Sequence, residues 1–297
     1  MAAIAAASGV QQVERGRRRF DAFPYLLLLP ATILVGSFTV LALLFTGVAS
    51  LTDWDVSRRV TSFIGLGNYA RAFKDAELLA SFARSSTFVL SVTFLSTLIG
   101  FLLAVALNRN LPGKGIVRAL VIVPWVISEL ATGVFWMILL QPDAPLGLIF
   151  GGPLRSASGA FVSLILVETW RSVGFAIVMP LAALQSVDES LYEAGKVDGA
   201  GAWRITWLIT LPLVSPTLLV VAILLMIGNF NLVTLIMALT AGGPISATTT
   251  TALLMYQKSF QYFQIGYGAS LSILMSIVNV IAMGCFVLLQ RGKGAVT

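Results

Sequence analysis

Long apolar runs separated by short polar stretches dominate the hydrophobic pattern of this chain. A helix needs about 20 residues to cross the roughly 30 Å hydrocarbon core of a bilayer, because each residue adds about 1.5 Å. Six runs reach that length, so the pattern predicts an all-α integral membrane protein with six transmembrane helices. The predicted spans are residues 25–50, 85–107, 119–140, 160–185, 213–239 and 265–290.

Positive charge flanks these runs unevenly, which indicates their orientation. Cytoplasmic loops of membrane proteins carry an excess of Lys and Arg. With the N-terminus inside, eleven of the 19 Lys and Arg residues face the cytoplasm, including the RGRRR cluster at 15–19. An even number of spans then predicts an N-in, C-in topology, with cytoplasmic tails at 1–23 and 291–297 around one membrane domain at 24–290.

The polar stretch between the fourth and fifth runs, residues 186–212, is a cytoplasmic loop in this topology. It starts with a helical pattern whose first turn is acidic, where the helix dipole favours negative charge. The DGAG stretch at 198–201 breaks that pattern, and glycine accepts the positive φ of a tight turn. A second helical pattern leads from Trp203 into the next span. Exposed Leu191, Tyr192 and Trp203 on this helix–turn–helix favour a docked surface over a solvated loop.

Composition narrows the class of function. Only 11% of the residues are charged and 58% are hydrophobic, whereas soluble domains carry about 25% charged residues. The chain has no histidine and one cysteine, Cys285, so it lacks the commonest general base and a Cys/His metal cluster. It also lacks a GxxxxGK[ST] phosphate-binding loop, and we expect neither ATP hydrolysis, nor a bound cofactor or metal, nor any other enzyme activity. Without a basic face interleaved with aromatics, the net charge of +6 predicts no nucleic-acid partner.

Three ionisable residues lie inside the predicted spans: Glu129, Glu168 and Arg171. A charge at the bilayer centre costs about 2.5–3.5 kcal/mol on insertion scales, so such groups face a partner or a water-filled cavity. Glu168, Arg171, Ser172 and Phe175 share one helix face through their i, i+3, i+4 and i+7 spacing. At this point two interpretations stand: Glu168 and Arg171 only neutralise each other, or they belong to a binding site.

Two further sets of polar or aromatic residues occur within the spans. Trp125 and Glu129 form an i, i+4 pair in the third span, just after Pro124. Asn229 and Asn231 occupy the middle of the fifth span, where a buried amide needs hydrogen-bond partners. These amides are predicted to contact a solute or, as an alternative that is strongest for Asn231, to bond between helices.

The polar loop resembles the signature loop of membrane subunits of bacterial ATP-binding-cassette importers, which reads E-A-A-x-x-x-G followed by L-P. Here EAG at 193–195, Gly199 and ITLP at 209–212 match it, with glycine in place of the second alanine. FIGLGNYARAF at 63–73 and NFNLVTLIMALTAGGPISATTT at 229–250 are similar to segments of the sugar-transporting branch. The resemblance covers most of the chain from about residue 24. It implies a coupling helix that contacts an ATPase subunit through Leu191, Tyr192, Glu193, Ala194, Asp198 and Gly199.

The resemblance also implies a sugar site near the middle of the membrane. In maltose-type permeases the third, fourth and fifth core spans form that site, and carboxylates, guanidinium and amides suit sugar hydroxyls while aromatic rings stack on a pyranose face. With the mid-span Asn231 added, the expected site comprises Trp125, Glu129, Glu168, Arg171, Ser172, Phe175, Asn229, Asn231 and Leu232.

The sequence thus predicts a permease subunit of an ATP-driven importer in the bacterial cytoplasmic membrane, forming half of the path for a sugar such as trehalose or a maltose-like disaccharide. The implied partners are a second homologous permease, two ATPase subunits that use ATP and Mg, the lipid bilayer, and an extracytoplasmic solute-binding protein or lipoprotein. Glycerol phosphate or another small polyol is an alternative substrate, because Arg171 suits a phosphate. An ion-coupled secondary transporter is the alternative of another class.

Overall fold

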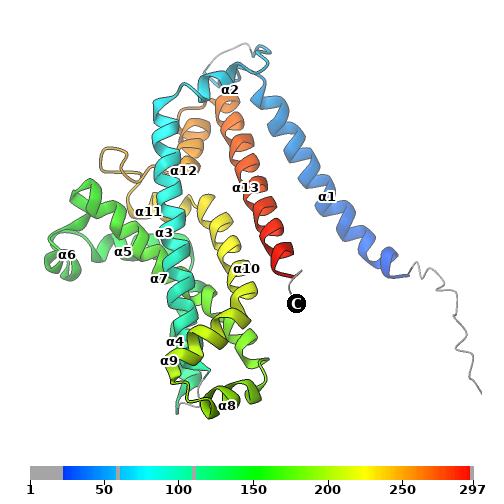
Figure 1. Cartoon of the computed structure of the whole chain (residues 1–297). Helices are drawn as coiled ribbons and strands as arrows, with labels where there is room; N and C mark the ends of the chain where they lie inside the picture. The colour runs from blue at the N-terminus through cyan, green and yellow to red at the C-terminus, as the bar shows by residue number, and fades with distance from the viewer. Residues whose placement is uncertain (1–22, 58–60, 109–111, 295–297) are drawn as a thin grey trace, which may run out of the picture. The chain divides into compact units, whose positions relative to one another are not determined.

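The structure is a computed structural model that describes residues 23–57, 61–108 and 112–294. The predicted N-terminal tail, except residue 23, lies outside the described residues with its RGRRR cluster, and so do residues 295–297. The chain forms two compact units, Met1–Phe45 and Thr46–Thr297. The helices (Figure 1) are α1 Phe23–Ser50, α2 Gly67–Ala72, α3 Ala76–Leu107, α4 Lys114–Val126, α5 Glu129–Leu139, α6 Pro145–Ile149, η1 Pro153–Arg155, α7 Ala157–Gln185, α8 Glu189–Val197, α9 Ala202–Ile205, η2 Thr206–Thr210, α10 Leu211–Phe230, α11 Thr234–Leu239, α12 Thr251–Tyr256, η3 Gln257–Gln261 and α13 Ile265–Gly294.

The all-α membrane fold predicted from the apolar runs is confirmed. Within the described residues, five helical stretches are long and apolar enough to cross a bilayer, or six if the bent pair α4 and α5 counts as one span. The first, fourth and sixth predicted spans coincide with α1, α7 and α13 to within a few residues. The second begins earlier than predicted, at Ala76, because the Asp75 side chain accepts hydrogen bonds from the backbone N–H groups of Glu77 and Leu78 and caps α3.

The continuous third span predicted at 119–140 is wrong. The chain bends by 97° between α4 and α5. Ile127 and Ser128 are extended, with ψ angles of 137° and 139°, so the helical hydrogen-bond ladder stops there. A β-branched Ile and a Ser suit the two positions, because the first favours extended backbone and the second favours the N-cap of a new helix.

The fifth predicted span, 213–239, is also interrupted. Helix α10 ends at Phe230, and the next six-residue helix, α11, starts at Thr234. Asn231 is the C-cap of α10, and its side-chain amide donates to the carbonyl of Ile227 at 2.7 Å. Asparagine competes for backbone groups in this way and thereby ends helices. Asn229 and Asn231 therefore lie at a helix end and not in the middle of a continuous span.

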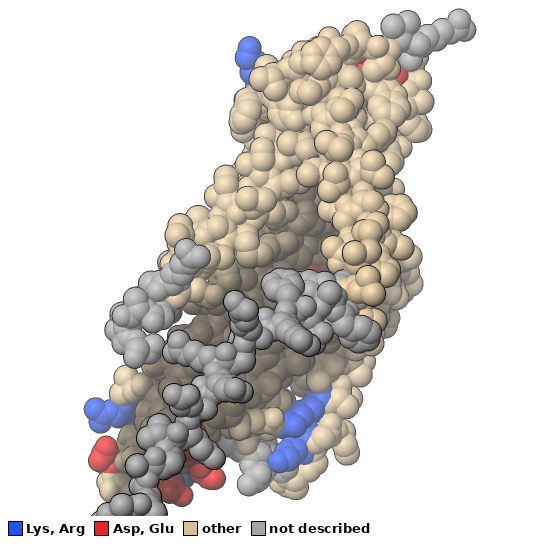
Figure 2. All heavy atoms as spheres, turned by 90° about the vertical axis from the view of Figure 1, so that its right-hand side faces the viewer, with Lys and Arg blue, Asp and Glu red and all other residues tan. Residues whose placement is uncertain are grey.

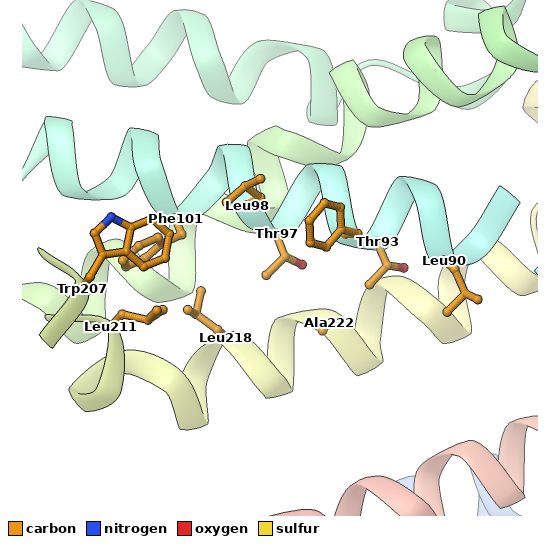
Figure 3. Close-up of a pocket in the computed structure, with 10 residues that line it drawn as sticks. Leu90, Thr93, Thr97, Leu98, Phe101, Trp207, Leu211, Leu218 and Ala222 are labelled. Carbon is orange, nitrogen blue, oxygen red and sulfur yellow. The ribbon is translucent and has the colours of Figure 1, made fainter. Parts of the chain in front are cut away.

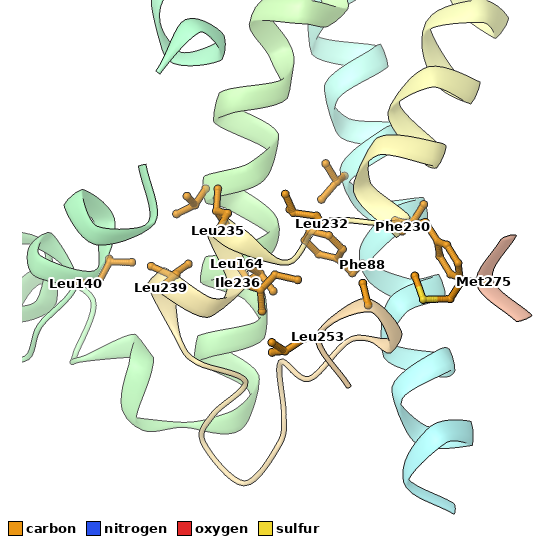
Figure 4. Close-up of a cluster of buried hydrophobic side chains, with 14 residues drawn as sticks. Phe88, Leu140, Leu164, Phe230, Leu232, Leu235, Ile236, Leu239, Leu253 and Met275 are labelled. Carbon is orange, nitrogen blue, oxygen red and sulfur yellow. The ribbon is translucent and has the colours of Figure 1, made fainter. Parts of the chain in front are cut away.

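Within the second unit, α7 packs against α3, α4, α10 and α11. Helix α3 packs along α7, α10 contacts both, α4 lies against α7, and α5 lies against α11 (Figure 1). Gly100 permits the close approach of α3 to α7, since an added Cβ would be 2.7 Å from the Cβ of Ala176. The largest buried cluster joins α3, α7, α10, α11, α12 and α13, and Phe88, Leu164 and Leu235 are among its members (Figure 4).

In Figure 2, tan uncharged residues make up most of the described surface, and the blue and red charged residues are few. At the N-terminal end of α3, the Tyr267 hydroxyl donates to the Asp75 carboxylate at 2.6 Å, and Lys258 pairs with Glu77 at 2.8 Å. Burial acts to raise the pKa of Asp75, but the hydrogen bonds from Tyr267 and from two backbone N–H groups outweigh it and lower that pKa below its ordinary value. These contacts connect α3 to η3 and α13.

Candidate functional site

The three ionisable residues expected within the membrane form one cluster beside the bend between α4 and α5. Nε and Nη2 of Arg171 donate to the two carboxylate oxygens of Glu168 at 2.9 and 2.7 Å, a bidentate ion pair on α7. The Ser172 hydroxyl donates to the same carboxylate at 2.7 Å. Glu129, at the first turn of α5, brings a carboxylate oxygen to 3.6 Å from Nη2 of Arg171. The helix face predicted from the 168–175 spacing thus meets Glu129.

Exposure divides the cluster into a hidden part and an accessible part. The Glu168 side chain is 0% exposed, Arg171 is 15% exposed and Glu129 is 38% exposed. The Glu168 carboxylate is therefore hidden in this conformation and holds the Arg171 guanidinium in place. The interpretation that Glu168 and Arg171 neutralise each other agrees with their geometry, whereas the Glu129 carboxyl group is the one open to an approaching molecule.

An aromatic pair lies next to the charged cluster. The rings of Trp125 on α4 and Phe175 on α7 are 5.5 Å apart and tilted by 49°. The predicted i, i+4 pairing of Trp125 with Glu129 is wrong, because the helix breaks between them. Both residues nevertheless approach α7, Trp125 through Phe175 and Glu129 through Arg171.

Glycines missed by the sequence reasoning set the approach of these helices. A Cβ added at Gly174 would be 2.8 Å from the Cβ of Trp125 and 2.9 Å from the Val121 carbonyl oxygen, so only glycine fits between α7 and α4. Gly133 has the same role between α5 and α11, where an added Cβ would be 2.5 Å from the Cβ of Ala238. Small residues inside apolar helices allow close helix packing. Glycines within the apolar runs were therefore the sequence signal for these contacts.

The three candidates from the fifth span lie at the break between α10 and α11. Asn229 is buried in the last turn of α10, and Leu232 is buried with Leu235 in the cluster of Figure 4. Asn231 is exposed, and its side-chain oxygen accepts from the Asn279 amide of α13 at 3.4 Å. Leu232 is therefore a packing residue in this conformation, and Asn231 makes the interhelical bond that was its alternative role.

A groove of about 360 Å³ lies elsewhere, between α3 and α10 (Figure 3). Leu90, Phe101 and Leu218 are among its lining residues, which are predominantly apolar, and none of the expected site residues belongs to it. A polyhydroxylated solute needs hydrogen-bond partners, and the polar side-chain atoms of this lining, on Thr93, Thr97 and Trp207, are buried. This groove is therefore not a sugar site of the kind expected from the sequence.

The polar segment between α7 and α10 folds as the predicted helix, turn and helix. Asp188 caps α8 by accepting from the backbone N–H of Ser190 at 2.9 Å, and this bond lowers the pKa of Asp188 below its ordinary value. Helix α8 ends at Val197, and Gly199 takes a φ of 75° in the following turn. Gly195 is buried against the second helical stretch, where an added Cβ would be 2.9 Å from Cδ1 of Ile209. Glycine at this position therefore lets α8 lie close to η2.

The side chains that the sequence assigned to a protein contact are mostly accessible. Leu191, Glu193 and Ala194 on α8 are exposed, and Tyr192 is half-buried. The turn residues Asp198 and Gly199 are exposed as well. This segment can therefore offer a carboxylate, an apolar side chain and a tight turn to another protein.

Comparison with known proteins identifies the family of this fold. The family model described as "Binding-protein-dependent transport system inner membrane component" matches residues 96–294, which include α4 to α13. A probable ABC transporter permease protein of Sinorhizobium fredii is 30% identical over 296 residues, covering 97% of this chain and 96% of that protein.

Two curated relatives have named solutes. The trehalose/maltose transport system permease protein of Thermococcus litoralis is 31% identical, with 86% of this chain and 88% of that protein covered. An sn-glycerol-3-phosphate transport system permease protein of Yersinia pestis is 29% identical, with 86% and 90% covered.

A solved structure shares the fold. The match is to a bacterial alginate ABC transporter in complex with an alginate pentasaccharide-bound periplasmic protein, with a TM-score of 0.77, 20% identity, and 90% of this chain and 93% of that chain covered. The order of the helices and the polar segment after α7 are consistent with these similarities. The chain belongs to the family of binding-protein-dependent transport system inner membrane components, the permease subunits of ABC transporters.

Proposed function

We propose that this chain is the permease subunit of an ATP-driven sugar importer in the bacterial cytoplasmic membrane. It forms half of the translocation path for a sugar. The first candidate for that sugar is trehalose or a maltose-like disaccharide. The curated trehalose/maltose relative supports this substrate class. The sn-glycerol-3-phosphate relative, of nearly equal identity, makes glycerol phosphate the second candidate.

The observation that carries the proposal is the exposed α8 segment between two apolar stretches. It places the Glu193 carboxylate on the surface of a capped helix, followed by the Gly199 turn. The chain has no phosphate-binding loop of its own, so the energy for uptake enters from an ATPase subunit through this segment. The complete importer then contains a second homologous permease, two ATPase subunits that use ATP and Mg, and an external solute-binding protein or lipoprotein.

The solute contacts the chain beside the bend between α4 and α5. Trp125 and Phe175 supply aromatic surface, and Glu129 supplies a carboxylate that accepts from sugar hydroxyls. Glu168, which accepts a hydrogen bond from Ser172, holds Arg171 in place. Asn229 is buried, and the Asn231 amide is engaged with Ile227 and Asn279, so both become solute ligands in a conformation that frees these side chains.

The Glu193→Ala variant tests the coupling role. In the importer reconstituted with its partners, we expect ATP-driven sugar uptake and solute-stimulated ATP hydrolysis to fall about tenfold or more, because one hydrogen bond to a charged group contributes about 1.5–3 kcal/mol. Radiolabelled uptake and phosphate release measure the two rates. Glu189→Ala is the matched control, since it removes another exposed carboxylate one helical turn away on α8. Unchanged uptake and hydrolysis in Glu193→Ala would contradict the coupling role.

A further inference from the structure

We infer that Glu129 makes this site selective for an uncharged sugar and against anionic solutes such as phosphate monoesters. The inference rests on the proposed function and defines the substrate class of the same site. It follows from the pairing of Arg171, from the exposure of the three charged groups, and from the absence of other charges on the helices that carry them.

The Arg171 guanidinium is already compensated by carboxylates. Its Nε and Nη2 atoms donate to Glu168, and Nη2 also faces Glu129 at 3.6 Å. One positive and two negative groups leave the cluster with a formal charge of minus one. A phosphate that recruited Arg171 would have to compete with Glu168 for the same N–H groups. If the phosphate took those N–H groups, the completely buried Glu168 carboxylate would lose its partner, which is strongly unfavourable.

The accessible charge of the cluster is the negative one. Glu129 is 38% exposed, while Arg171 is 15% exposed and Glu168 is fully buried. A solute that approaches the α4–α5 bend therefore meets a carboxylate before it meets the guanidinium. A carboxylate in this position repels an approaching anion.

No other residue of α5 or α7 offsets this charge. Glu129 is the sole charged residue of α5, and Glu168 and Arg171 are the sole charged residues of α7. Helix α4 carries Lys114 and Arg118 in its first turns, but Arg118 precedes Trp125 by seven residues, about 10 Å along the helix. Glu129 is the first residue of α5, and the N-terminal end of a helix is a favourable place for a carboxylate.

A neutral sugar fits the same groups without such a conflict. Its hydroxyls donate to the Glu129 carboxylate, and a pyranose face can pack on Trp125 or Phe175, whose rings lie 5.5 Å apart. The arrangement therefore supports the first of the two proposed substrates, the disaccharide, over glycerol phosphate.

The local charge can be measured with a cysteine beside Glu129. Ser128 is exposed and adjacent to Glu129, so Ser128→Cys places a thiol at the site. The variant is made in a chain in which Cys285→Ser has removed the single native cysteine. The probes are a trimethylammonium and a sulfonate methanethiosulfonate reagent, applied to the purified, assembled importer. We expect the cationic reagent to react at least fivefold faster than the anionic one. The ratio cancels effects of thiol reactivity that are common to both reagents.

Charge variants of Glu129 complete the test. Glu129→Gln should lower that rate ratio at least threefold, and Glu129→Asp, which keeps the charge, should preserve it. Ile245→Cys, on a loop side chain that is 97% exposed, is the control whose ratio should not respond to Glu129→Gln. Equal reagent rates at Ser128→Cys, or a ratio that Glu129→Gln leaves unchanged, would overturn the inference.

The labelling ratio is measured without transport, so its failure is distinct from failure of the Glu193 test. Uptake provides the second arm of the experiment. ATP-driven uptake of glycerol 3-phosphate by the wild-type importer, at a rate comparable with that of trehalose, would overturn the charge selectivity while leaving the importer function in place.

Discussion

Replacing Arg171 with alanine is expected to prevent the chain from assembling into a stable complex. The substitution leaves the Glu168 carboxylate, which is 0% exposed, without the bidentate partner that now lies at 2.7 and 2.9 Å. Breaking a buried ion pair from one side costs about 3–5 kcal/mol, a large part of the stability of most domains. The yield of complex in size-exclusion chromatography and its thermal midpoint measure the effect.

The paired neutral variant distinguishes an orphaned charge from a lost side-chain contact. Glu168→Gln with Arg171→Gln removes both charges and keeps two amides able to hydrogen-bond, so we expect it to recover most of the yield lost in Arg171→Ala. If Arg171→Ala assembled normally and lost only sugar uptake, the ion pair would have no structural role. Arg171 would then act through the solute alone.

The sequence contains enough information to predict this pair but not its accessibility. The i, i+3 and i+4 spacing of Glu168, Arg171 and Ser172 places their side chains on one face of any continuous helix, and α7 is continuous there. Exposure depends on which other helices cover that face. Such contacts come from distant segments, so periodicity within one helix could not show that Glu168 is hidden and Glu129 is open.

The two interrupted spans show the limit of reading apolar length alone. Residues 119–140 and 213–239 are hydrophobic enough to cross a bilayer as straight helices, and hydrophobicity was the criterion used. The local backbone preferences of Ile127, Ser128 and Asn231 instead interrupt the two helices. In a membrane, such breaks are tolerated where other protein segments surround the backbone or where it lines a cavity.

The coupling segment was more predictable, because its signals are local. An acidic first turn, a DGAG break and a resumed helix correspond to α8, the turn at Gly199 and the stretch from α9 into α10. Helix propensity alone assigns the glycine at position 195 only a loosening effect on α8. Its contact with Ile209 shows a packing role, which depends on the fold of the neighbouring stretch and not on helix propensity.

Gly174→Leu is expected to separate α4 from α7 and to destabilise the complex by about 3 kcal/mol, the upper end of the range for overpacking. Even the first added carbon would be 2.9 Å from the Val121 carbonyl oxygen, and a backbone atom cannot rotate aside. Because the same contact brings Trp125 to Phe175, the aromatic surface of the site should be lost together with stability. Thermal unfolding of the purified complex and the KM for sugar uptake measure the two effects.

A second helical glycine provides the matched control. Gly284 in α13 has no atom within 4 Å of an added Cβ, so Gly284→Leu makes the same chemical change in open space. Leucine is also a better helix former than glycine by nearly 1 kcal/mol, and the control should therefore keep or slightly raise the thermal midpoint. Equal midpoints for the two variants would mean that α4 and α7 adjust freely. The placement of Trp125 over Phe175 would then not depend on Gly174.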